Sequence, residues 1–135
     1  MSATPQEVFQ RYVYAGAMTR DADALSELFT EDGVLEAPLL AEGSAFPRRT
    51  VGREAIRTAL AEYYARPVGG PKTPNLEKSG YVLHLTADPD VFIAEIDTAF
   101  DGEDGEEETV SLVQVFRLRD GKIARLRDYF APTLV

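Results

Sequence analysis

One carboxyl group stands in an apolar context close to the end of the chain. Asp128 lies two residues after Leu126 and two before Phe130, within the segment GKIARLRDYFAP at 121–132. Side chains alternate between the faces of a strand, so a strand over 122–130 places these three on one face. If that face lines a pocket, burial raises the pKa of the carboxyl toward neutrality, where general acid–base catalysis operates. The alternative, and the common case for an aspartate, is a solvent-exposed position near a strand end.

The preceding hairpin decides which residues lie beside Asp128, because a shift of one residue reverses the faces of a strand. A two-residue turn at 120–121 pairs Asp128 with Val113, whereas a three-residue loop at 119–121, with a left-handed glycine, pairs it with Leu112. We favour the three-residue loop, which collects the more apolar side chains on the face of Asp128: Leu112, Phe116, Leu118, Ala124, Leu126 and Phe130.

The favoured pairing also fixes the polar neighbours of Asp128. Gln114 shares its face, either as a structural amide satisfied by backbone or as a group that orients Asp128 or a ligand. Arg127 falls on the opposite face with Ile123, so no adjacent arginine neutralises the carboxyl. A carboxyl in this setting is a candidate acid–base group.

The rest of the chain must supply the walls of such a pocket. The 3.6-residue pattern of apolar positions predicts helices in the first half, and turn residues separate runs with the character of strands in the second. The expected helices span 5–16, 21–29 and 53–65, and the expected strands 34–37, 76–86, 91–100, 109–119 and 122–130. Helices followed by antiparallel strands make an α+β domain, whose sheet can curl around the helices and leave a pocket between them.

Other segments mark the ends of these elements. Thr4 and Glu7 are placed to form a capping box for the first helix, and Asp21 is placed to cap the second. Segments 39–51 and 67–74 are expected to be irregular, and the second of them to be mobile because of its prolines and glycines. The acidic segment 101–108 is expected to be the solvated tip of a hairpin.

Composition limits the classes of function. The 135 residues make one domain, 1–135, with 44% hydrophobic and 27% charged residues. A net charge of −9 disfavours nucleic acid and anionic membranes as partners. The absence of cysteine removes disulfides, thiol nucleophiles and zinc–thiolate sites. No membrane span or secretion signal is visible, so we expect a cytoplasmic protein.

Four segments together resemble a known family. FTEDGV at 29–34, GREAI at 52–56, VFRLRDGKI at 115–123 and RDYF at 127–130 resemble the SnoaL-like branch of the nuclear-transport-factor-like, ketosteroid-isomerase-like superfamily. The resemblance covers nearly the whole chain. It implies a cone-shaped curved antiparallel sheet packed on three N-terminal-half helices, enclosing a pocket, and a homodimer formed through the outer face of the sheet.

The functional residues of ketosteroid isomerases are only partly matched. Ala37 stands where the resemblance implies the aspartate base, and Gln114 where it implies an aspartate on the oxyanion side. One residue among Tyr12, Val13 and Tyr14 falls at the place of the tyrosine donor on the first helix. The resemblance therefore does not imply steroid isomerisation by that mechanism.

Two other groups of the superfamily are similar to this chain, the polyketide cyclases and the phenazine-biosynthesis A/B proteins. DPDVF at 88–92 and RDYFAP at 127–132 resemble segments of the phenazine proteins, which carry an acid–base glutamate where Asp128 stands. Their catalytic histidine on the third helix is replaced, at about Ala59, by a methyl group. Asp128 is thus the one acid–base position of the family that is kept here.

The leading hypothesis is an enzyme without cofactor or metal that acts on a small apolar, cyclic or aromatic metabolite of secondary metabolism. Asp128 would carry a proton in a cyclisation, isomerisation, dehydration or condensation. The substrate-binding residues would be Gln114, Tyr12, Tyr14, Leu112, Phe116, Leu126, Phe130, Tyr63 and His84. The competing hypothesis is a module of the same fold that binds a small ligand or dimerises without catalysis.

Three further polar residues have structural interpretations. His84 is the single histidine, so no metal set forms around it, and a strand histidine is more often structural than pocket-lining. Glu95 and Asp97 share one strand face and are expected to pair with arginines of neighbouring strands on the outer face.

Overall fold

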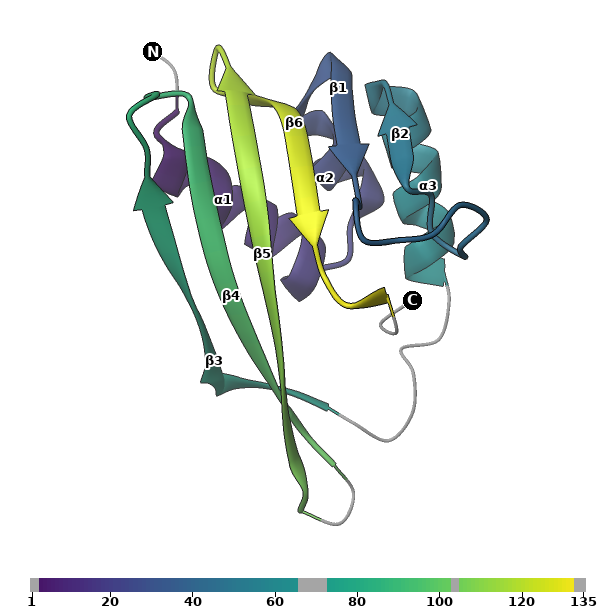
Figure 1. Cartoon of the computed structure of the whole chain (residues 1–135), viewed down its shortest axis with the longest axis vertical. Helices are drawn as coiled ribbons and strands as arrows, with labels where there is room; N and C mark the ends of the chain where they lie inside the picture. The colour runs from purple at the N-terminus through teal and green to yellow at the C-terminus, as the bar shows by residue number, and fades with distance from the viewer. Residues whose placement is uncertain (1–2, 66–72, 103–104, 133–135) are drawn as a thin grey trace.

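The computed structural model describes residues 3–65, 73–102 and 105–132. Its helical elements are α1 (Pro5–Val13), the π-helical turn η1 (Tyr14–Met18), α2 (Ala22–Glu27) and α3 (Arg53–Ala65). Its strands are β1 (Phe29–Glu36), β2 (Arg49–Val51), β3 (Thr73–Leu85), β4 (Val91–Asp101), β5 (Glu107–Arg119) and β6 (Lys122–Tyr129). The three α-helices lie on one face of the sheet (Figure 1), which confirms the predicted α+β class.

The six strands form one open, curved sheet in the order β2-β1-β6-β5-β4-β3. Neighbouring strands are antiparallel except β1 and β6, which run parallel and pair Leu35 with Leu126. The sheet is therefore mixed, and the expectation of a purely antiparallel sheet needs this correction. The parallel pair joins the first strand of the chain to the last, which places Asp128 next to the helical half of the molecule.

The helix boundaries follow from local capping. The Thr4 hydroxyl accepts from the Glu7 amide at 3.2 Å while the Thr4 amide donates to the Glu7 carboxylate at 3.1 Å, so the predicted capping box forms. Asp21 accepts from the Ala24 amide at 3.0 Å and begins α2, as predicted. The second helix ends at Glu27, earlier than predicted.

The first three strands depart most from the prediction. β1 begins at Phe29 rather than at position 34, and β2 lies inside the segment 39–51 that we expected to be irregular. Most of the expected irregular segment 67–74 lies outside the described residues, although β3 already begins at Thr73. In the acidic segment, positions 103–104 also lie outside them.

The β5–β6 hairpin corrects the predicted register. Asp120 and Gly121 have φ values of 52° and 78°, so the turn has two residues and the favoured three-residue loop is wrong. A bulge at Ala124 then shifts the register, and Gln114 lies directly opposite Asp128. The bulge compensates for the shorter turn, so Asp128 still shares a face with Gln114. The two-residue turn pairs Ile123 with Leu118, so Ile123, which we expected on the outer face, is fully buried in the core.

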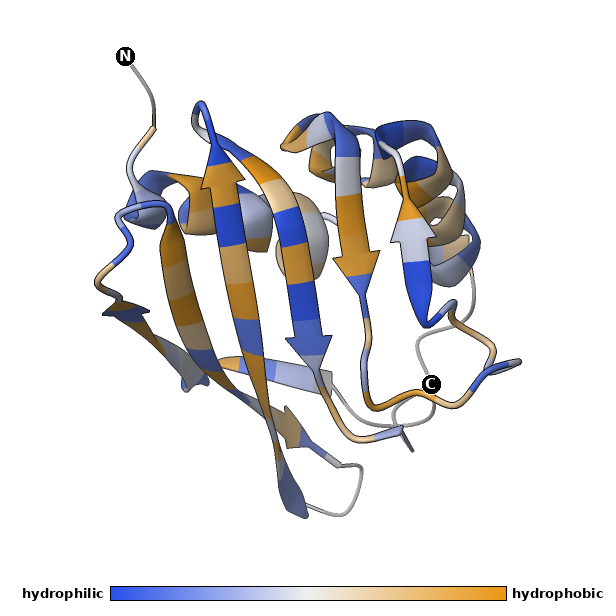
Figure 2. Cartoon of the chain, turned by 45° about the horizontal axis from the view of Figure 1, so that its top comes forward, coloured by the Kyte–Doolittle hydropathy of each residue, from blue (hydrophilic) through white to orange (hydrophobic). Residues whose placement is uncertain are grey.

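The core lies between the helices and the inner face of the sheet. Phe92 and Phe116, on β4 and β5, stack with centroids 4.7 Å apart, and Phe9 of α1 meets Phe116 edge-on at 5.7 Å. All three rings are fully buried. Apolar and polar residues alternate along β4, β5 and β6 (Figure 2), as expected for strands with one buried face.

Candidate active site

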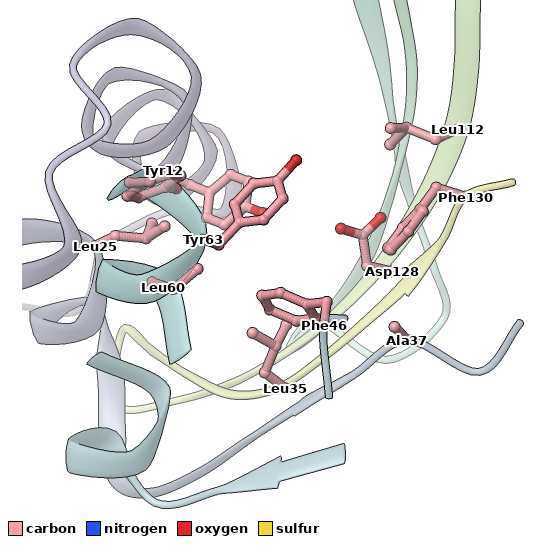
Figure 3. Close-up of a pocket in the computed structure, with 11 residues that line it drawn as sticks. Tyr12, Leu25, Leu35, Ala37, Phe46, Leu60, Tyr63, Leu112, Asp128 and Phe130 are labelled. Carbon is pink, nitrogen blue, oxygen red and sulfur yellow. The ribbon is translucent and has the colours of Figure 1, made fainter. Parts of the chain in front are cut away.

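A cavity of about 190 Å³ lies between the helices and the inner face of the sheet (Figure 3). Its walls come from the helices α1, α2 and α3, the strands β1, β5 and β6, the segment between β1 and β2, and the residue that follows β6. They are lined by Tyr12, Leu25, Leu35, Ala37, Phe46, Leu60, Tyr63, Tyr64, Leu112, Asp128 and Phe130. Among these described lining residues, Asp128 carries the one carboxyl group.

Asp128 projects from β6 into this cavity, on the sheet side and facing the tyrosine rings of the helices (Figure 3). Its side chain is partly buried, and Oδ1 is shielded from solvent without a hydrogen-bond partner in the described part of the chain. Burial raises the pKa of the carboxyl from 3.8 to about 6, and the nearby Gln114 amide, which favours the charged form, limits the rise. Near neutral pH the group can both accept and return a proton.

The predicted separation of Asp128 from arginine is confirmed. Arg127 points to the other face of β6, where its Nε lies 3.5 Å from Glu36 and its guanidinium lies 5.5 Å from the ring of Tyr129. No cation therefore offsets the burial of the Asp128 carboxyl among the causes of its raised pKa.

Gln114 and Tyr12 form a buried polar pair next to Asp128. The Gln114 side chain is 4% exposed, and its Nε2 donates to the Tyr12 hydroxyl oxygen at 3.1 Å. Burial, and then the charge of Asp128, raise the pKa of Tyr12 well above 10.0, so its hydroxyl stays protonated. Because the oxygen already accepts from Gln114, the proton of this hydroxyl remains to be donated. Tyr12 lines the cavity, whereas Gln114 lies behind it and holds it in place.

The Gln114 carbonyl oxygen has no hydrogen-bond partner within the described residues, like Oδ1 of Asp128. The two residues face each other across the β5–β6 pair. A proton on Asp128, or a donor group on a ligand, would satisfy these acceptors. The Tyr12 hydroxyl donor and these two acceptors thus lie beside a mostly apolar wall.

Arg20 holds the two tyrosines of α3. Its guanidinium carbon lies 4.8 Å from the centroid of the Tyr64 ring and 5.9 Å from that of Tyr63, and Nη2 donates to the Tyr64 carbonyl at 3.1 Å. Burial raises the pKa of Tyr64 to about 12 despite this cation. The Tyr64 hydroxyl therefore stays protonated, and both rings line the cavity.

The structure gathers part of the predicted substrate-binding set around Asp128. Tyr12, Tyr63, Leu112 and Phe130 line the cavity with it. Phe116 and Leu126 share the face of Asp128 but are fully buried in the core beneath, so they support the site rather than line it. Ala37 lines the cavity and offers a methyl group where the resemblance implied a base.

Two predicted residues lie elsewhere. Tyr14 is 63% exposed, because two positions along a helix turn a side chain about 200° away from Tyr12. His84 projects from β3 to the outer face, where its Nε2 contacts Glu95, and it does not line the cavity. Successive side chains of a strand point to opposite faces, and the neighbouring Leu83 takes the inner face and packs against the core.

The polar residues of the outer strands also pair differently from the prediction. Glu95 contacts His84, and Asp97 accepts a hydrogen bond from the Ser111 hydroxyl at 2.6 Å. The expected arginine partners are therefore wrong. Both carboxylates are exposed and satisfied.

The sequence did not assign several lining residues to the site. Leu25 and Leu60 lie on the apolar stripes of their helices, so periodicity marked them as buried but not as pocket residues. Phe46 comes from an irregular segment and had no periodic signal. Its burial could have been suspected only from its size and apolar character.

Within the described residues, no three histidine, aspartate or glutamate side chains come together as metal ligands. No helix that the structure describes is long and apolar enough to span a bilayer.

The sequence of residues 9–126 matches the SnoaL-like domain. The chain belongs to the SnoaL-like family. The Bacillus subtilis (strain 168) protein YesE is 33% identical to it over 129 residues, which cover 93% of this chain and 80% of YesE. The predicted family membership is confirmed.

Several solved structures have the same fold as this chain. A Bacillus subtilis protein described as a putative isomerase is similar with a TM-score of 0.73 and 28% identity, over 96% of this chain and 88% of its own. The phenazine biosynthesis-related protein of Pseudomonas aeruginosa has a TM-score of 0.69 at 21% identity, over 96% and 80% of the two chains. A putative polyketide cyclase of Pseudomonas putida has a TM-score of 0.66 at 18% identity, over 98% of this chain and 95% of its own. The last two likenesses show the fold alone.

Proposed function

We propose that this SnoaL-like protein is a cofactor-independent enzyme that moves a proton on a small, largely apolar cyclic or aromatic molecule. Asp128 is the acid–base group. The observation that carries this proposal is its carboxyl, which faces an apolar cavity without a partner for Oδ1 in the described chain and has a pKa of about 6. The description of the Bacillus subtilis structure as a putative isomerase supports the same class of reaction.

The proposed step begins with the ionised carboxylate of Asp128, which removes a proton from a carbon next to a carbonyl group. The electron pair of the broken C–H bond forms a C=C bond, and the carbonyl electrons move to the oxygen. That oxygen accepts a hydrogen bond from the Tyr12 hydroxyl, which Gln114 orients through the 3.1 Å contact. Asp128 now holds the proton, and the substrate is an enolate.

The fate of the enolate determines the reaction. Return of the proton from Asp128 to a different carbon gives an isomerisation. Attack of the enolate carbon on a second carbonyl gives a cyclisation or a condensation, and the Asp128 proton neutralises the new alkoxide. Departure of a β-hydroxyl group with that proton gives water and a dehydrated product. All four reactions therefore need the same arrangement of Asp128 and Tyr12.

We further propose that the protein is a cytoplasmic homodimer that acts on a molecule of secondary metabolism. The outer face of the sheet is the proposed dimer surface, and it exposes the apolar side chains Val82 and Val113 at 57% and 37%. A pocket on the inner face would remain open to substrate in such a dimer.

The second candidate is a binding module without catalysis. It is favoured by the methyl groups of Ala37 and Ala59 at the places of two catalytic residues of related enzymes. Ala37 lines the cavity and Ala59 is buried, so neither adds an acid–base group. In this case Asp128 would only accept a hydrogen bond from the ligand.

The test uses cyclohex-2-enone as a probe and follows the replacement of its exchangeable protons by deuterium in D₂O by NMR. We expect exchange above the buffer rate in the wild type and a loss of about 100-fold or more in Asp128→Asn, as is usual when a general base is removed. Asp97→Asn is the matched control, because it makes the same change at an exposed position. Exchange at the wild-type rate in Asp128→Asn would sink the proposal. Binding without exchange in any variant would favour the module.

A further inference from the structure

The size of the cavity limits which molecules can reach Asp128. A cavity of about 150 Å³ in a protein core is large enough to bind benzene. The cavity here measures about 190 Å³, which leaves room for one six-membered ring with one or two small substituents. Two fused rings would not fit without movement of a wall.

The walls also limit the charge of the ligand. No lysine, arginine or histidine is among the described residues that line the cavity, and seven of the eleven side chains are aliphatic or phenylalanine. An anionic ligand would lose its hydration without a cationic partner and would lie close to Asp128. The surroundings therefore favour a neutral ring with one carbonyl or hydroxyl group.

Phe46 is one of three wall residues outside the helices and strands, and the other two, Ala37 and Phe130, directly follow β1 and β6. It lies in the segment between β1 and β2, whose ends are joined by a hydrogen bond from the Ala37 amide to the Arg48 carbonyl at 2.8 Å. This segment turns Phe46 inward, so that only 8% of it is exposed. Its ring meets Tyr63 edge-on with centroids 5.5 Å apart. Figure 3 shows it between the tyrosines of the helices and the strand that carries Asp128.

The other large wall residues have a second role. Leu25, Leu35 and Leu60 belong to the same buried core cluster as Phe46, but they come from α2, β1 and α3. A change at these positions would disturb the packing of helices on the sheet. Phe46 fills the space between the tyrosines and β1 from a surface segment, so its size can vary with less effect on the rest of the fold.

We propose that Phe46 sets the upper size limit of the pocket, so that the protein accepts neutral one-ring carbonyl compounds and excludes fused two-ring compounds. Replacement of the Phe46 ring by a methyl group would leave space for a second ring at the same place. The inference rests on the proposed function, because it takes Asp128 as the group that the ligand must reach.

The experiment compares cyclohex-2-enone with 1-tetralone, a neutral ketone with two fused rings. Binding to the wild type, Phe46→Ala and Phe46→Leu is followed by chemical-shift changes of the pocket residues in NMR spectra. The spectra also show whether each variant is folded. Phe100→Ala is the matched control, because Phe100 lies on β4 and does not line the cavity.

We expect the wild type to bind cyclohex-2-enone and not 1-tetralone. Phe46→Ala should bind 1-tetralone at least about tenfold more tightly than the wild type does, with a smaller gain for Phe46→Leu. Phe100→Ala should behave as the wild type. Wild-type binding of 1-tetralone at the pocket, no binding of cyclohex-2-enone, or no gain in folded Phe46→Ala and Phe46→Leu would overturn the inference.

The same samples in D₂O separate this inference from the proposed function. Size selection without exchange that depends on Asp128 would support the role of Phe46 and contradict the enzymatic proposal. Exchange that depends on Asp128, with no effect of Phe46 on the choice of ring size, would support the enzymatic proposal and contradict the role of Phe46.

Discussion

The carboxyl groups on the two faces of the sheet have different neighbours. On the outer face, Asp97 accepts a hydrogen bond from Ser111, and Glu36 lies 3.5 Å from Arg127 and 3.7 Å from Arg49. On the inner face, Asp128 faces an apolar cavity, and within the described chain its Oδ1 has no partner. The same chemical group is thus satisfied on one face and left without a counter-charge on the other.

This difference separates the part of the sheet that stabilises the fold from the part that is available for chemistry. A paired, exposed carboxylate contributes little to stability and is not reactive. A buried carboxyl without a cation destabilises the folded state when it ionises, and its raised pKa makes it a useful acid–base group. Groups of this kind are kept mainly where a function requires them.

The largest expected effect on stability is that of Asp128→Asn, and it depends on pH. The folded-state pKa of about 6 exceeds the ordinary value of 3.8, so the folded protein binds the proton more tightly than the unfolded chain does. Stability therefore falls as the pH rises through this window, by about 3 kcal/mol once both states are ionised. Asparagine cannot ionise, so this loss is absent in the variant. Relative to the wild type, Asp128→Asn should gain about 2 to 3 kcal/mol between pH 4 and pH 8.

Urea unfolding of both proteins at the two pH values measures this gain, because the titration of all other groups cancels in the difference. Asp97→Asn removes an exposed carboxylate and serves as the matched control. A difference for Asp128→Asn that does not change with pH would mean that its carboxyl is solvated and that the two faces of the sheet are alike.

A smaller effect is expected at the tyrosines of the first helical segment. Tyr12→Phe removes the oxygen that accepts from Gln114 and leaves that buried amide without its partner, so it should lower stability by about 1 to 2 kcal/mol. It should also slow the deuterium exchange of cyclohex-2-enone by about tenfold or more, because it removes the donor to the enolate oxygen. Tyr14→Phe changes an exposed side chain and should have almost no effect on either. Equal effects of the two changes would contradict the assigned helix register.

Some elements of the fold could be predicted from the sequence and others could not. The start of α1 and of α2 could be predicted because Thr4, Glu7 and Asp21 form local capping interactions. The parallel pairing of β1 with β6 could not, because it joins residues far apart in the sequence and depends on packing of the whole core. β2 has only three residues, too few for any periodic pattern.

The residues of the candidate site could also be predicted only in part. Asp128 could be found because two-residue alternation fixes its face relative to Leu126. The bulge at Ala124 has no signature in the side chains, so the register was wrong even though the face was right. Phe46 lies in a segment without periodicity, and its position depends on how that segment folds back over the pocket.

The smallest expected effect is that of the pair formed by His84 and Glu95 on the outer face. Both side chains are about half exposed, at 47% and 60%. Exposed pairs of this kind contribute at most about 1 kcal/mol, since water screens the charges and the side chains lose conformational freedom. A double-mutant cycle with His84→Ala and Glu95→Ala, measured by urea unfolding, should give a coupling energy within this limit.

A larger coupling would bear on the outer face as a whole. Exposed groups couple weakly because water surrounds them, so a strong and salt-resistant coupling would require that the face be covered in solution. The proposed dimer surface includes the neighbouring Val82, and a second copy of the chain would provide such a cover. The coupling should then decrease as the protein is diluted, whereas for an uncovered pair it should not change. The coupling between His84 and Glu95 therefore also tests whether the outer face is exposed to solvent or covered in a dimer.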